Sequence, residues 1–196
     1  MFMPNEENSG FSSFIWGSGI TPSSNAYGLF SQTADSTPIE NTIVESSLIG
    51  VGQGQFIVPS NNFKKGDSFQ LFMLGHLSSV NGDTLTIKLK EVNTNIILAS
   101  SGAITMKSAT NQHFELQAIF TIREIGIPST ASIFTGAFFN YVRNGSTNLE
   151  SQIFSNGNST TFNTTISNQL DITAQWSSAS VNNSIYSEIL SLTKIY

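Results

Sequence analysis

The chain has 196 residues, of which only 11% are charged and none is cysteine, and its formal net charge is −5. The missing cysteines exclude disulfide staples, thiol nucleophiles and zinc ribbons. The eight Lys and Arg residues are scattered without forming a basic patch, which disfavours nucleic-acid binding. There is no transmembrane run and no signal-peptide pattern at the start, so membrane insertion is not expected.

Residues 1–26 differ from the rest because they show neither the period of a strand nor that of a helix. We expect an irregular N-terminal arm, and two interpretations of it remain open. It is either a tail partly tucked against the domain or an anchoring arm that docks onto another protein, since a cluster of exposed aromatic residues is normally covered. The particle-docking residues of such an arm would be Phe11, Phe14, Ile15 and Trp16.

From Tyr27 onward the hydrophobic pattern has the period of β-strands. Residues 68–79 and 83–92 flank Asn81-Gly82, a pair that favours a tight primed turn and therefore predicts a hairpin. The longest clean alternation lies in residues 113–125. The side chains expected to face inward from these segments are Leu85, Ile87, Leu89, Phe114, Leu116, Ala118, Phe120 and Ile122.

The whole of residues 27–196 gives about ten strands at the spacing typical of sandwiches and barrels, and no convincing amphipathic helix. The predicted fold class is all-β, a two-sheet antiparallel jelly-roll sandwich. An immunoglobulin-type sandwich is less favoured because its Cys–Trp–Cys signature is absent.

Two segments, 131–142 and 184–196, carry apolar residues on both faces. In the second, Ile185 and Ile189 are expected to point one way and Leu190 and Leu192 the other. Such a strand needs a cover on each side, which is either the chain alone or the chain plus another copy of the protein. The predicted oligomer interface consists of Phe134, Phe138, Tyr141, Tyr186, Leu190, Leu192 and Tyr196.

No catalytic, metal or cofactor site is predicted. His76 and His113 lie in predicted strands, without a spacing that joins them to each other or to a carboxylate. No nucleophile elbow is present, and the carboxylates are expected to be solvated surface charges. Trp176 is expected to pack in the core or an interface, with stacking against a sugar as the alternative.

Several phrases of the domain resemble a family of virion structural proteins. They are YGLFSQTADSTPIENT (27–42), SLIGVGQGQFIVPSNNFKKGDSF (47–69), TLTIKLK (84–90), HFELQAIFTIREIG (113–126) and TTFNTTISNQLDITAQWSSASVNNSIYSEILSLTKIY (160–196). The family is one of large DNA viruses, including Marseillevirus-type giant viruses, and of bacteriophages. The resemblance implies a non-enzymatic protein located in the virion. It also implies a homotrimeric jelly-roll head like those of tumour necrosis factor and C1q, with other virion proteins as partners.

Two other functions remain open at this stage. One is the receptor- or carbohydrate-binding head of a viral attachment protein, which would use loops such as 143–149 or 155–160 to bind a host-surface receptor or glycan. The other is a polysaccharide-active enzyme, which would need two carboxylates that face one cleft.

Overall fold

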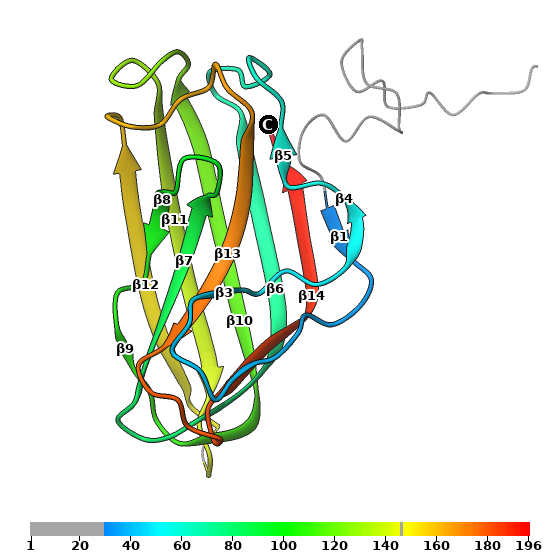
Figure 1. Ribbon diagram of the computed structural model, residues 1–196, viewed down its shortest axis with the longest axis vertical. Coiled ribbons are helices and arrows are strands. Elements are labelled where there is room, and N and C mark those ends of the chain that lie inside the picture. The colour runs from blue at the N-terminus through cyan, green and yellow to red at the C-terminus, as the bar shows by residue number, and fades with distance from the viewer. Residues whose placement is uncertain (1–29, 146) are drawn as a thin grey trace, which may run out of the picture.

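The computed structural model describes residues 30–145 and 147–196, and every regular element in them is a β-strand (Figure 1). The long strands run along the longest axis of the molecule. The strands are β1 (Phe30–Gln32), β2 (Ile39–Glu40), β3 (Ser46–Ser47), β4 (Gly52–Gly54), β5 (Ile57–Val58), β6 (Ser68–Ser79), β7 (Thr84–Glu91), β8 (Ile96–Ser100), β9 (Ile104–Thr105), β10 (Ala109–Glu124), β11 (Ser132–Val142), β12 (Leu149–Asn158), β13 (Asn168–Trp176) and β14 (Ser184–Lys194).

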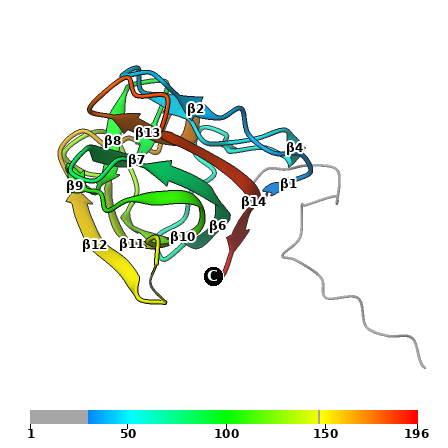
Figure 2. The same ribbon diagram turned by 90° about the horizontal axis from the view of Figure 1, so that it is seen from below.

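The described strands form two antiparallel sheets. The larger has the order β12-β11-β10-β6-β14-β1-β4, with β2 also paired to β14. The smaller has the order β3-β13-β7-β8, with β5 paired to β13 and β9 to β7. Seen along the strands the sheets are two layers, with β12, β11, β10, β6 and β14 on one side (Figure 2). The prediction of an all-β, two-sheet antiparallel sandwich is therefore confirmed.

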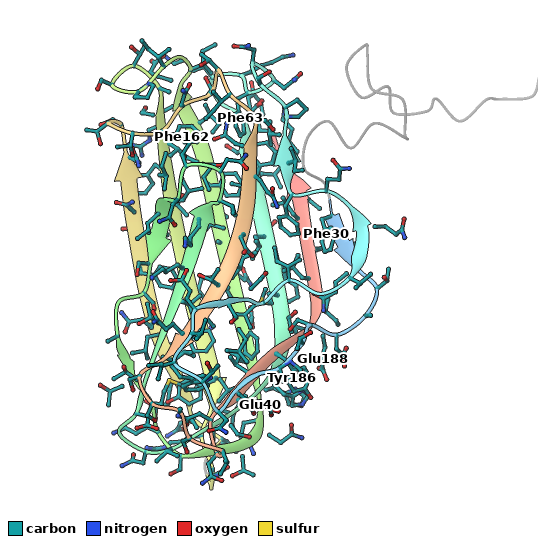
Figure 3. All side chains as sticks on the ribbon, viewed as in Figure 1. Phe30, Glu40, Phe63, Phe162, Tyr186 and Glu188 are labelled. Atoms are coloured by element: carbon teal, nitrogen blue, oxygen red, sulfur yellow. The ribbon has the colours of Figure 1, made fainter. Side chains whose placement is uncertain are left out.

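The core lies between these layers and is built by strict alternation. Every second residue of β6 and β7 is buried, and the inward positions predicted for β7 and β10 are all buried. At one end of the sandwich, the rings of Phe63 and Phe162 lie 5.9 Å apart (Figure 3). At the same end, Phe69 contacts Phe63 and stacks on Phe120 at 5.0 Å.

Trp176 is a core residue, as one of the two interpretations predicted. It is 1% exposed, and its indole N–H donates to the Ile39 carbonyl oxygen at 3.0 Å. Since the ring has no exposed face, it cannot stack against a sugar.

The predicted hairpin between residues 68–79 and 83–92 is wrong. β6 pairs with β10 and β14 in the larger sheet, whereas β7 pairs with β13, β8 and β9 in the smaller one. The turn between them carries the chain from one sheet to the other. Only Gly82 has a positive φ, 94°, so the turn is not of the primed type that joins paired strands.

The prediction of which side chains face the core in residues 184–196 is also wrong. The register of β14 against β6 shifts between Ser187 and Ile189, so Glu188 is the extra residue of a β-bulge. The bulge reverses the alternation, which leaves Ile185 buried and Ile189 exposed. Leu190 and Leu192 consequently face the core with Ile185 and not an outer surface.

Candidate functional site

The outer faces of the two sheets differ in character. On the smaller sheet, Lys88 and Lys90 project outward from β7 and bind the Glu45 carboxylate at 2.5 and 2.9 Å. The Thr173 hydroxyl of β13 donates to the same carboxylate at 2.8 Å. The centre of this face therefore carries a charged network formed within the chain itself.

We expect Glu45→Gln to lower stability in a pH-dependent way. Burial raises the pKa of the Glu45 carboxyl, but the hydrogen bonds from the two lysines and Thr173 outweigh it and lower the pKa from 4.5 to about 2. The contribution is therefore full above pH 4.5 and is lost as the pH falls toward 2. Urea denaturation should show wild type more stable than the variant by about 1–2 kcal/mol at pH 7, after allowance for solvent screening. A gap that is the same at pH 7 and pH 2.5 would contradict this account.

The outer face of the larger sheet is mainly apolar and polar-uncharged. Among its exposed large side chains are Ile153 at 79%, Ile189 at 53%, Ile119 at 48% and Phe134 at 37%. Partly buried side chains lie between these exposed ones, and both groups together are called the outer face. They are Phe72, Leu74, His76, His113, Phe138 and Tyr186, in addition to the four just named.

The register divides the outer face into two halves. In the β6–β14 half, Leu74 lies opposite Ile189, and His76 opposite Tyr186. In the β10–β12 half, Phe138 lies opposite Ile153 across β11 and β12. Both halves expose apolar area that this chain does not cover in its described part.

Three polar side chains meet at the end of the β6–β14 half. The rings of His76 and His113 are 4.1 Å apart, because these residues lie directly opposite on β6 and β10. A Glu188 carboxylate oxygen is 3.0 Å from His76 Nδ1, although this buried nitrogen makes no hydrogen bond of good geometry. Tyr186 and Glu188 lie beside Glu40, where β14 meets β2 (Figure 3).

The proximity of the two histidines to each other and of His76 to the Glu188 carboxylate was not predicted from the sequence. Sequence spacing could not reveal this cluster, since it depends on cross-strand register and on the bulge at Glu188. Within residues 30–145 and 147–196, no group of three or more His, Cys, Asp or Glu residues is placed to hold a metal ion.

The predicted interface residues fall into two groups. Tyr141, Leu190 and Leu192 are at most 2% exposed and belong to the core, so their assignment to an oligomer surface is corrected. The Tyr141 hydroxyl accepts the Lys107 backbone N–H at 2.7 Å, which anchors a neighbouring loop. The other four residues are accessible: Phe134, Phe138 and Tyr186 on the outer face, and Tyr196 just beyond β14. The predicted arm residues, Phe11, Phe14, Ile15 and Trp16, lie outside the described residues.

Two carboxylates expected to be solvated serve the fold instead. Glu91 is fully buried, and its oxygens accept the backbone N–H groups of Asn93 and Thr94 at 2.9 and 2.8 Å. Asp83 accepts hydrogen bonds from Ser178 and Asn183, which lower its pKa. These contacts give both carboxylates a role in holding loops.

A comparison of the chain with profiles of known protein families finds no match, and neither do comparisons with curated proteins and with solved structures. The described part of the chain has no helix that is long and apolar enough to cross a membrane. The functional conclusion therefore depends on the geometry of the outer face and on the resemblance noted above.

Proposed function

We propose that this protein is a non-enzymatic structural protein that assembles with copies of itself through the β6–β14 half of the outer face. The observation that carries the proposal is the apolar patch formed there by Phe72, Leu74, Tyr186 and Ile189. Burial of such area is favourable by about 25 cal/mol per Å². The opposite outer face of the sandwich carries the charged Glu45 network at the corresponding place.

We further propose that the sandwich is a jelly roll and that the assembly is a trimer. The jelly roll is supported by the way the chain alternates between layers. The orders β1-β14-β6-β10 and β3-β13-β7-β8 interleave strands far apart in sequence, as two Greek keys do, and the β11–β12 pair extends the larger sheet. The trimer is supported by the resemblance to trimeric heads and by the patch on β14, the strand expected near a threefold axis.

The virion is the proposed location of this assembly. Its support is the resemblance to virion structural proteins, together with a composition that is low in charge and free of cysteine. Other virion proteins are the proposed partners.

The test is the solution mass of the full chain, measured by light scattering after size exclusion over a range of concentrations. We expect three chains for wild type and a lower mass for Ile189→Asp, because a carboxylate in the patch must be desolvated on assembly. The matched control is Ile97→Asp on β8 of the smaller sheet, where Ile97 is 42% exposed, and it should keep the wild-type mass. A monomer for wild type at all concentrations would overturn the proposal.

A second candidate, a receptor- or glycan-binding head, is favoured by a pocket at the loop after β11. It has a volume of about 290 Å³ and is lined by Asn81, Lys107, Ser108, Arg143, Asn144 and Gly145. Two of the chain's eight basic residues, Lys107 and Arg143, line this pocket. The ligand class that they favour is an acidic glycan, whose carboxylate or sulfate groups can bind to them. A glycan array at millimolar ligand that gives no binding, or binding unchanged in Lys107→Ala, would argue against this role.

A further inference from the structure

The β10–β12 half of the outer face contains a hollow of about 560 Å³. Its floor is formed by Gly136 of β11 and Ser155 of β12, which lie directly opposite each other. We refer to it as the Gly136 hollow. The large exposed or partly exposed side chains that line it are Ile119, Phe138 and Ile153.

Gly136 is not required by the fold of the chain. A Cβ added there would meet no atom within 4 Å, and its φ is not in the left-handed region. Glycine inside a strand weakens the strand and often marks a place where another group approaches the backbone closely. The missing side chain therefore keeps the floor of the hollow open to a group from outside the sheet.

We propose that the aromatic segment of residues 11–16 of the same chain docks in the Gly136 hollow, with Trp16 as the inserted side chain. This segment, FSSFIW, concentrates Phe11, Phe14, Ile15 and Trp16 in the part of the chain that precedes β1. The apolar walls and the small residues of the floor suit a flat aromatic ring. Aromatic rings prefer offset or edge contacts with other rings, and Phe138, which lines the hollow, can offer such a contact.

The connecting chain is long enough for this docking within one molecule. Phe30, the first residue of β1, pairs with Leu192 of β14, and the same row continues through Leu71 and Ala118 to Ala137, next to Gly136. The path from β1 to β11 crosses four strand spacings, or about 19 Å. Residues 17–29 can span about 43 Å when extended, more than twice that distance.

The test is ¹⁹F NMR of the full chain labelled with 5-fluorotryptophan. The chain has two tryptophans, so two resonances are expected, and Trp16→Phe assigns them. Buried Trp176 serves as the internal control for folding. The measured quantity is the solvent-isotope shift of each resonance, which approaches zero for a protected ring and the free-amino-acid value for an exposed one.

We expect Trp16 to be protected in wild type and exposed in Gly136→Leu and in Ser155→Leu, two variants that fill the hollow from different strands. The control is Thr193→Leu. Thr193 lies on β14 of the same sheet, outside the hollow, so this variant should leave Trp16 protected. An exposed Trp16 in wild type would overturn the proposal and favour an arm free to bind another protein. Protection that persists in both filled variants would overturn it equally, because the segment would then dock elsewhere.

The inference goes beyond the proposed assembly and is separable from it. Ile189→Asp should lower the solution mass without exposing Trp16, whereas Gly136→Leu should expose Trp16 without lowering the mass. The solution mass therefore tests the assembly, and the protection of Trp16 tests the docking, independently of each other.

Discussion

Replacing Leu190 with Asp is expected to abolish folding of the chain. Leu190 is 1% exposed and lies opposite Met73, which is fully buried. A carboxylate at this position would have no partner, and an unpaired buried charge costs several kcal/mol. Because the whole folding free energy of a domain is only about 5–15 kcal/mol, we expect insoluble protein or a chain without a cooperative urea transition. Circular dichroism and urea denaturation provide the measurement.

The neighbouring residue gives the matched control for this experiment. Ile189 is 53% exposed on the outer face, so Ile189→Asp should stay folded, with a wild-type circular dichroism spectrum and a cooperative urea transition. A folded, soluble Leu190→Asp protein would show that β14 does not have the phase described here. The two adjacent substitutions therefore test the bulge at Glu188 directly.

Sequence alternation predicted the strands well where one face is buried and the other wet. In β7, Leu85 and Ile87 alternate with Thr86 and Lys88, and a period of two can be interpreted in only one way. The same holds for β10 from residue 113 onward, where the five side chains predicted to face inward are all buried. The alternation in these strands was sufficient to predict an all-β sandwich, although it did not predict which strands pair.

Strand pairing could not be obtained from the same pattern. β6 and β7 both alternate and are joined by a short turn containing Asn81-Gly82, which is also the signature of a hairpin. A turn that passes between the layers of a sandwich uses the same kinds of residue. Only the long-range contacts of β6 with β10 and β14 distinguish the two cases.

The candidate site was predicted in part. The apolar character of β11 and β14 correctly drew attention to Phe134, Phe138 and Tyr186, which lie on the outer face. However, one inserted residue, Glu188, makes a regular strand look apolar on both sides, and so Leu190 was placed on the wrong face. A bulge has no reliable signal in a single sequence, because any residue can occupy it.

The Gly75→Ala substitution should disrupt the pairing of β6 with β14 beside this bulge. A Cβ on Gly75 would overlap the Tyr186 carbonyl oxygen, and it would lie 2.8 Å from both the Ser187 Cα atom and a carbon of the Phe114 ring. Two of these obstacles are backbone atoms of a paired strand, so they cannot move without breaking hydrogen bonds between the strands. We expect a loss of about 3 kcal/mol or more in urea denaturation.

Gly136→Ala is the matched control, since both glycines lie inside long strands of the same sheet. Its Cβ would enter open space, and alanine in a strand loses less conformational entropy on folding than glycine does. The control should therefore be as stable as wild type or more stable by about 0.5–1 kcal/mol. If Gly75→Ala matched its control, β6 and β14 would not approach as closely as the bulge requires. A large difference between the two variants would instead show that glycine at 75 is needed for strand pairing and that glycine at 136 is not.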